Sequence, residues 1–122
     1  MTPQLCLGTA QFGLAYGITN AAGQVPEDAV APLLLQAQEA GIRWLDTAQA
    51  YGNAEAVLGR QLPVAHGFRL ISKLPAQPQP VFSAKDADAW EQAFLRSCHR
   101  LGAQCLDALL LHAPADLIKP GA

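Results

Sequence analysis

The segment IRWLDTAQAYGNAEAVLG, residues 42–59, contains one complete step from a strand to a helix. Its first part, Ile42–Ala48, is of strand length and mostly apolar, and Asp46 interrupts it near its end. The second part carries apolar residues at helical spacing, with Asn53 placed where its side chain can cap a short helix that Pro63 ends. The segment therefore predicts a β-strand, a polar loop and an α-helix in that order.

The same alternation continues on both sides of this segment. Further strand-length apolar runs are Gln4–Thr9, Phe68–Leu74 and Cys105–His112. Two more helices are predicted, one ended by Gly41 and one that opens with the capping-box pair Ser83 and Asp86 and ends at Gly102. The resulting order, β-α-β-α-β-α-β, predicts a parallel sheet with right-handed crossovers. Because the strand runs are apolar at successive positions, we expect both faces of the sheet to be buried.

Two folds of the α/β class accept this order, an open doubly wound sheet and part of a (β/α)₈ TIM barrel. The first predicts a GxGxxG turn after the first strand. Residues 8–13 read GTAQFG instead, without the middle glycine, and no helix is expected directly after them. A complete barrel needs about 250 residues. We therefore expect residues 1–122 to form one domain, the N-terminal half of a (β/α)₈ barrel that stops after its fourth strand.

Composition excludes several classes of function. The formal net charge is −2, from 8 basic and 10 acidic residues, which argues against a surface that binds nucleic acid. No apolar run approaches the roughly 18 residues of a membrane span, and the start does not resemble a signal peptide. The sequence therefore predicts a cytoplasmic protein that contacts neither nucleic acid nor membrane.

The cysteines and histidines predict neither a disulfide framework nor a metal site. Cys6, Cys98 and Cys105 are an odd number and form no CxxC pair. Two of them, Cys6 and Cys105, fall in strand-length runs, where we expect them to be buried as small apolar residues. The three histidines show no metal-ligand spacing with the cysteines. No metal is therefore expected.

Polar residues interrupt the apolar runs at the ends of three predicted strands. Asp46 ends the second run, Lys73 lies near the end of the third, and His112 ends the fourth. Tyr51 follows Asp46 in the loop before the next helix. Alone, each has an ordinary structural explanation, such as a capping aspartate or a lysine whose ammonium reaches solvent. Together they favour a site, because the carboxyl ends of the strands in a βα fold meet at one rim.

These four groups can be combined as a general acid with its supporting charges. A free tyrosine side chain titrates near pH 10, which is too high for ready proton exchange at neutral pH. An adjacent ammonium such as that of Lys73 favours the ionised phenol, and Asp46 supplies the counter-charge that a buried lysine needs. His112 can donate a hydrogen bond to a substrate oxygen. The set therefore suits proton delivery to a carbonyl that becomes an alkoxide.

Four segments resemble motifs of the aldo-keto reductase family, in the same order and with compatible spacing. The block DTAQAYGNAE with LG, residues 46–59, resembles the signature around the catalytic Asp and Tyr of the family. The other three are LGT–FG at residues 7–13, ISK at 71–73 and LDxLLLHxP at 106–114. The resemblance extends from about Leu5 to Pro114.

The resemblance implies a (β/α)₈ barrel that uses NADPH, or less often NADH, to reduce an aldehyde, ketone or sugar carbonyl, without a metal. In that assignment Tyr51 is the proton donor, Lys73 and Asp46 tune it, and His112 orients the small-molecule carbonyl substrate. Gly8, Thr9 and Ala10 would lie near the nicotinamide, and Asp46 would lie near its ribose. The protein would place these groups, while the cofactor would supply the hydride.

Two departures from the family pattern limit what the resemblance implies. Ala113 stands where many members carry an aromatic residue after the histidine. The sequence also ends at Ala122, and the basic residues that hold the adenosine phosphate in the family come from the second half of the barrel. We therefore expect the isolated chain to be nearly inactive. The alternative is a non-catalytic half-barrel whose two open sheet edges pair with a second copy or with a partner.

Overall fold

The computed structural model describes residues 4–122, so residues 1–3 of the predicted domain lie outside it. Its centre is a four-stranded parallel sheet in the order β1-β2-β3-β4. The strands are β1 (Cys6–Gly8), β2 (Trp44–Asp46), β3 (Arg69–Leu74) and β4 (Ala108–Leu111). A doubly wound sheet reverses its strand order at a switch point, whereas a barrel adds each strand beside the last. The sequential order therefore agrees with the predicted N-terminal part of a (β/α)₈ barrel.

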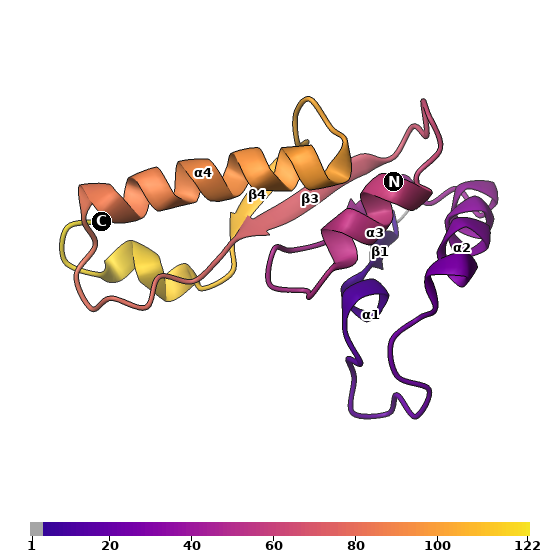
Figure 1. Cartoon of the computed structure of the whole chain (residues 1–122), viewed down its shortest axis with the longest axis horizontal. Helices are drawn as coiled ribbons and strands as arrows, with labels where there is room; N and C mark the ends of the chain where they lie inside the picture. The colour runs from indigo at the N-terminus through magenta and orange to yellow at the C-terminus, as the bar shows by residue number, and fades with distance from the viewer. Residues whose placement is uncertain (1–3) are drawn as a thin grey trace.

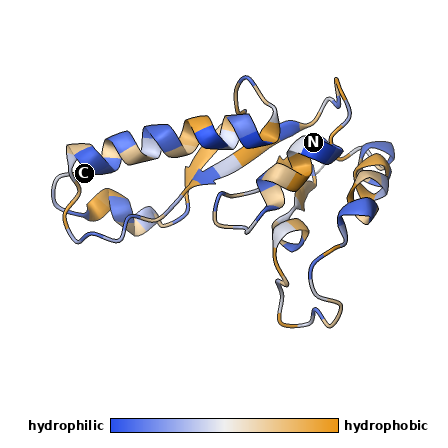
Figure 2. Ribbon diagram, in the orientation of Figure 1, coloured by the Kyte–Doolittle hydropathy of each residue, from blue (hydrophilic) through white to orange (hydrophobic). Residues whose placement is uncertain are grey.

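Three long helices connect consecutive strands, as predicted: α2 (Glu27–Glu39), α3 (Ala54–Gln61) and α4 (Ala84–Leu101). In Figure 1, α4 runs alongside β3, which it contacts, and Figure 2 shows hydrophilic and hydrophobic residues alternating along it. Two short elements were not predicted, α1 (Ala10–Gly13) and the 3₁₀ helix η1 (Pro114–Ile118). The short α1 lies within residues 8–13, and the next helix, α2, begins only at Glu27, so no helix directly follows Gly13, as expected. One helical turn is too short to show a helical period in the sequence.

The ends of the helices test the predicted stop and start signals. Gly41 and Gly102 adopt positive φ values of 83° and 63°, as residues that end helices in the left-handed region do. The Asp86 carboxylate accepts a hydrogen bond from the Ser83 backbone N–H at 2.8 Å, in agreement with the capping box. Asn53 precedes α3, but its side chain makes no capping bond. Its Oδ1 accepts a hydrogen bond from Gln24 Nε2 instead, at 3.0 Å, so a partner from a distant loop replaces the expected cap.

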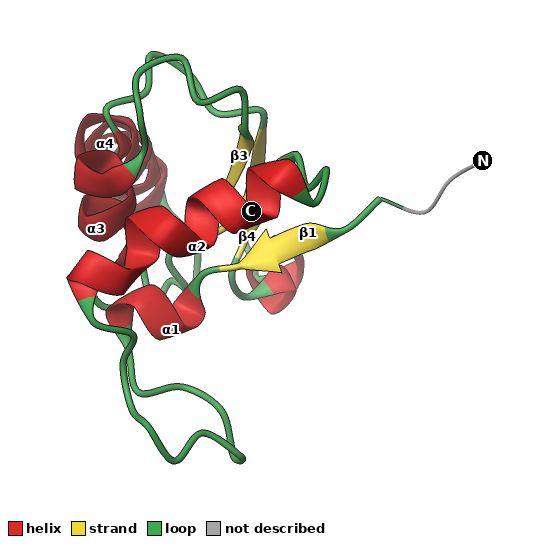
Figure 3. Ribbon diagram, turned by 90° about the vertical axis from the view of Figure 1, so that its right-hand side faces the viewer, coloured by secondary structure: helices red, strands yellow, loops and turns green. Residues whose placement is uncertain are grey.

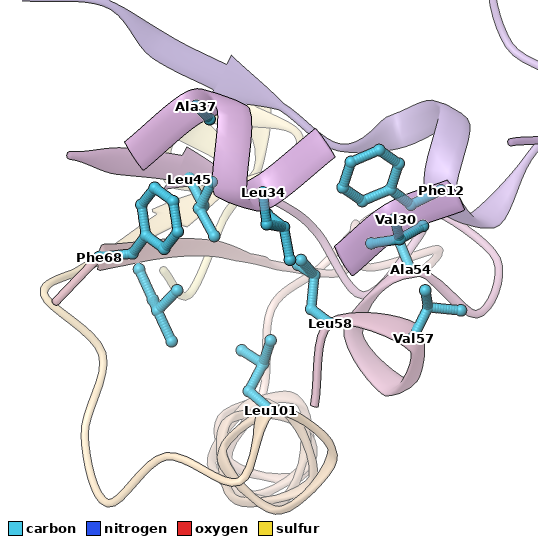
Figure 4. Packing of buried hydrophobic residues seen from close by; sticks show 11 residues of the cluster. Phe12, Val30, Leu34, Ala37, Leu45, Ala54, Val57, Leu58, Phe68 and Leu101 are labelled. Atoms are coloured by element: carbon cyan, nitrogen blue, oxygen red, sulfur yellow. The ribbon is translucent and has the colours of Figure 1, made fainter. Parts of the chain in front are cut away.

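The core lies between the sheet and the helices (Figure 4). Leu45 of β2 meets Leu34 of α2 and Leu58 of α3 in one cluster, and all three side chains are fully buried. Burial of one such side chain stabilises a fold by about 1.5–3 kcal/mol relative to leaving it in water. The other members of the cluster are Phe12, Val30, Ala37, Ala54, Val57, Phe68, Leu70 and Leu101.

The edges of the sheet are less covered than the sequence predicts. Leu109 and Leu110 point to opposite faces of β4, yet they remain 40% and 46% exposed. Cys6 and Cys105 are also exposed, so the expectation that they are buried was wrong. Among residues 4–122, β1 and β4 each pair with a single strand, so no strand pairs with their outer edges. The apolar strand pattern therefore indicated surfaces that these residues only partly bury.

The loop between α1 and α2 projects away from the sheet (Figures 1 and 3). Within the described part of the chain, no helix combines the length and the apolar character needed to cross a membrane.

Candidate active site

An ion pair joins the carboxyl ends of the two central strands. Asp46 of β2 lies opposite Ile71 of β3, and Lys73 projects from the same face of β3 two residues later. Lys73 Nζ donates hydrogen bonds to Asp46 Oδ1 at 2.7 Å and to the backbone oxygen of Thr47 at 3.0 Å. The side chains of Lys73 and Asp46 are only 15% and 30% exposed. The ammonium is therefore fixed by two oxygens in a partly desolvated position.

Tyr51 and His112 complete the group that the sequence predicts. Lys73 Nζ lies 5.0 Å from the centre of the Tyr51 ring. The rings of Tyr51 and His112 meet edge to face, with 6.0 Å between their centres. The backbone N–H of His112 bonds to the oxygen of Leu74, which fixes the residue at the end of β4 beside β3. The fold thus brings all four predicted side chains to one rim.

Two glycines let the loop that carries Tyr51 lie against α1. A Cβ atom added to Gly13 would stand 1.8 Å from the backbone oxygen of Tyr51. A Cβ atom on Gly52 would stand 2.2 Å from the backbone oxygen of Gly13, and Gly52 has a φ of 56°. Only glycine therefore permits this approach without a shift of the backbone. Neither glycine was predicted from the sequence to have a role, although both belong to the segments that resemble the family.

The turn after β1 lies next to the ion pair. Gly8 is the register partner of Asp46, and a Cβ atom added to Gly8 would meet nothing within 4 Å. Thr9 is fully buried, and its hydroxyl and its backbone N–H both donate to the backbone oxygen of Asp46. Ala10 opens α1 and is half-buried. Gly8 therefore offers open space beside Asp46, while Thr9 ties the turn to β2.

A buried polar cluster lies behind the rim, and the sequence patterns did not predict it. The Glu55 side chain of α3 is 3% exposed, and its Oε1 accepts hydrogen bonds from Ser72 at 2.7 Å and Ser97 at 2.8 Å. Arg100 Nη1 lies 3.5 Å from Glu55 Oε2. The available signal was Ser97, a polar residue on the face of α4 that packs inward.

Other titratable groups lie outside this group of four. Burial, together with the nearby Asp46 carboxylate, raises the pKa of the Cys6 thiol. His66 lies in the loop before β3, where its Nδ1 accepts a bond from the Phe68 N–H and burial lowers its pKa. His99 is exposed on α4. Across residues 4–122, no three or more His, Cys, Asp or Glu side chains are grouped so that they could hold a metal ion.

Comparisons of the sequence with known proteins identify related proteins and a family. The sequence profile of the Aldo/keto reductase family matches residues 4–118. A 6-dehydroglucose reductase from Novosphingobium aromaticivorans is 34% identical over 93% of this chain and 41% of its own length. An aldo-keto reductase from Mycolicibacterium paratuberculosis is 34% identical over 86% of this chain and 34% of its own length.

Solved structures show the same relationship. A protein from Pseudomonas aeruginosa, described as an aldo-keto reductase, superposes with a TM-score of 0.70 at 32% identity. The match covers 89% of this chain and 42% of that protein. A thermostable aldo-keto reductase crystallised with the inhibitor epalrestat gives a TM-score of 0.68 over 96% of this chain and 40% of its own, and at 24% identity it shows the fold alone.

The chain therefore spans between about a third and two fifths of the length of the relatives it matches. Within that span the match is nearly continuous, since the family profile leaves only a few residues at each end unmatched. The parallel β/α architecture is that of the N-terminal part of the barrels of these relatives. This chain belongs to the aldo/keto reductase family.

Proposed function

We propose that the protein is an NAD(P)H-dependent oxidoreductase that reduces an aldehyde, ketone or sugar carbonyl to the alcohol, with Tyr51 as the proton donor. The observation that carries this proposal is the position of the Lys73 ammonium, which contacts Asp46 at 2.7 Å and lies 5.0 Å from the Tyr51 ring centre. A relative named 6-dehydroglucose reductase makes sugar carbonyls the first substrates to try. The enzyme would act in the cytoplasm.

Each of the four rim residues has a separate task in this reaction. The Tyr51 hydroxyl gives its proton to the carbonyl oxygen as that oxygen gains negative charge. The Lys73 ammonium favours the phenolate that remains, and Asp46 holds Lys73 charged and in place. His112, which meets the Tyr51 ring edge, donates a hydrogen bond that orients the carbonyl.

The turn after β1 fits the nicotinamide end of NADPH, or of NADH. Gly8 leaves open space beside Asp46, so the backbone there would accept the nicotinamide, and Asp46 would bind its ribose. Thr9 acts indirectly, since its side chain holds the turn against β2. A cofactor held there would supply the hydride and be oxidised, while Tyr51 would supply the proton that completes the alcohol. No metal takes part in the proposed reaction.

The Tyr51→Phe variant tests the assignment in the full polypeptide that the gene encodes. Removal of the hydroxyl deletes the proton donor but keeps the ring, so we expect reduction of small aldehydes and sugar carbonyls to fall at least 100-fold. Affinity for NADPH, measured by quenching of protein fluorescence, should stay within about twofold. The matched control is Tyr16→Phe, because Tyr16 lies in the projecting loop and is 58% exposed. Retained turnover in Tyr51→Phe would refute the assigned role.

The second candidate function is assembly through the open sheet edges. It is favoured by the exposure of Leu109 and Leu110 on β4 and by an apolar groove beside β1, which Leu7, Phe12 and Leu33 line. Two copies of this chain could bury these surfaces by pairing their edges. Sedimentation of the isolated 122-residue chain decides: a folded dimer that lacks reductase activity would support assembly, whereas a stable folded monomer would count against it.

A further inference from the structure

We propose that Glu55 is a positioning residue of the reductase, whose buried carboxylate holds α3 and β3 so that Tyr51 and Lys73 face each other. This inference rests on the proposed function, because it concerns the proton donor and the ammonium beside it. Glu55 itself touches neither residue. It acts through the backbone elements that carry them.

The contacts of Glu55 join three elements of the fold. Oε1 accepts a hydrogen bond from Ser72 of β3 at 2.7 Å and another from Ser97 of α4 at 2.8 Å. Both serines are buried. Arg100 of α4 approaches Oε2 at 3.5 Å and is 41% exposed. The carboxylate is therefore held by two short bonds within the fold and neutralised from the surface side.

Each end of this connection leads directly to a residue of the rim. Ser72 precedes Lys73, and neighbouring residues of a strand point to opposite faces, so Ser72 faces the helices while Lys73 faces Asp46. On the other side, Glu55 is the second residue of α3, and the N–H of Ala54 bonds to the oxygen of Tyr51 at 3.0 Å. A shift of α3 relative to β3 would therefore change the distance between Tyr51 and Lys73.

The close approach of α3 and α4 shows why the Ser97 hydroxyl reaches Glu55. A Cβ atom added to Gly59 of α3 would stand 1.9 Å from the backbone oxygen of Arg100 of α4. Glycine at this position lets the two helices pack backbone against backbone. The polar cluster therefore lies in a close-packed contact between α3 and α4.

A carboxylate is a costly choice for this position if packing alone is required. Removal of a charge from water is unfavourable unless hydrogen bonds and a counter-charge compensate it. An apolar side chain could fill the same space without that cost. The carboxylate accepts two short, directional hydrogen bonds, which fix the positions of β3 and α4 relative to α3. Reacting groups need such control, since a displacement of about 1 Å can lower a rate 100-fold.

The test compares Glu55→Gln with Glu27→Gln in the full polypeptide. Glu27 is the matched control, because its carboxylate also joins two helices, α2 to α3 through Arg60, but does not contact β3. The amide of Glu55→Gln keeps the shape and one acceptor oxygen while it removes the charge that strengthens both bonds. The readouts are the rate of the first turnover of bound NADPH, the dissociation constant for NADPH and the KM of the carbonyl substrate.

We expect Glu55→Gln to lower the rate of the first turnover about 10- to 100-fold, with the dissociation constant and KM within about twofold of wild type. Glu27→Gln should match wild type in all three. A general loss of folded enzyme would lower the active fraction instead, which active-site titration corrects. An unchanged first-turnover rate in Glu55→Gln, or an equal fall in Glu27→Gln, would overturn the proposal.

A second variant and a structural readout keep the test decisive. If Glu55→Gln does not fold, Ser97→Ala decides alone: it removes one bond to Glu55, and the first turnover should slow severalfold, whereas an unchanged rate would overturn the proposal. If the wild-type protein reduces no carbonyl, the proposed function fails, but the positioning role is still measured by nuclear Overhauser contacts between the Tyr51 ring and the Lys73 methylenes. Those contacts should weaken in Glu55→Gln and persist in Glu27→Gln, and their persistence in both would overturn the role.

Discussion

Two ion pairs of equal length lie in different regions of this molecule. At the rim, Lys73 Nζ and Asp46 Oδ1 are 2.7 Å apart, and on the outer surface between α2 and α3, Arg60 Nε and Glu27 Oε1 are also 2.7 Å apart. The surface pair has the more regular geometry, because Arg60 Nη2 adds a second bond to Glu27 at 2.9 Å. The rim pair is nevertheless the one that the proposed reaction uses.

The difference between the two pairs lies in what surrounds them. The Lys73 and Asp46 side chains are 15% and 30% exposed, against 53% and 40% for Arg60 and Glu27. Water weakens the attraction within the surface pair, and pairs of that kind contribute little to stability. The rim pair acts in a less polar setting and shares its ammonium with Thr47 and the Tyr51 ring. The N···O distance alone therefore does not distinguish an ion pair that only joins two helices from one that would take part in the reaction.

The largest expected contrast comes from removal of the cation of each pair. Lys73→Met should lower the reductase activity of the full polypeptide about 100-fold or more, since Tyr51 loses the ammonium that favours its phenolate and Asp46 is left unpaired. Arg60→Met should keep wild-type activity, because its partner remains in water. Steady-state reduction of a small aldehyde measures both variants. An equal loss of activity in Lys73→Met and Arg60→Met would contradict the different roles assigned to the two ion pairs.

A smaller effect is expected from the packing around the rim. Gly13→Ala would place a methyl group 1.8 Å from the backbone oxygen of Tyr51, so the loop must move, and we expect destabilisation by about 1–3 kcal/mol. Urea denaturation measures this change. Gly8→Ala is the control, because its added methyl meets nothing within 4 Å and stability should stay within about 0.5 kcal/mol. Gly8→Ala should instead weaken binding of NADPH, and a stable Gly13→Ala protein would contradict the close packing of this loop.

The smallest effect concerns the surface pair and pH. Hydrogen bonds from Arg60, and then from Gln61, lower the pKa of Glu27 to about 2 from 4.5. Between these values the unfolded chain binds more protons at this group than the folded chain does. The contribution of the pair is thus complete above about pH 4.5 and is lost as the pH falls toward 2. The difference in urea midpoint between wild type and Glu27→Gln should shrink over that range, and a constant difference would contradict the pKa assignment.

Much of the fold could be predicted because its signals are local. Four apolar runs, the glycines at positions 41 and 102 and the pair formed by Ser83 and Asp86 specify elements through neighbouring residues. The short α1 escaped prediction, since a single turn has no period. The cap predicted for Asn53 failed because Gln24, 29 residues away, provides its hydrogen bond.

Some residues of the candidate site could likewise be predicted from local sequence signals, and others could not. Asp46, Lys73 and His112 could be found because each stands at the end of an apolar strand, and strand ends meet in a parallel β/α fold. Glu55 could not, because a glutamate in the first turn of a helix ordinarily faces water and favours the helix dipole. Its burial depends on Ser97, which lies 42 residues later in the chain. The roles of Gly13 and Gly52 likewise depend on the contact between two distant backbone segments.

The sequence by itself therefore determined the order of strands and helices, the parallel sheet and the identity of the polar residues at the ends of its strands. Only the tertiary structure decided that Lys73 meets Asp46 and Tyr51, that Glu55 is buried behind them and that Cys6 and Cys105 are exposed. The physical reason is the range of the forces involved. Periodicity and capping act over a few neighbouring residues, whereas burial and pairing depend on which segments the chain brings together.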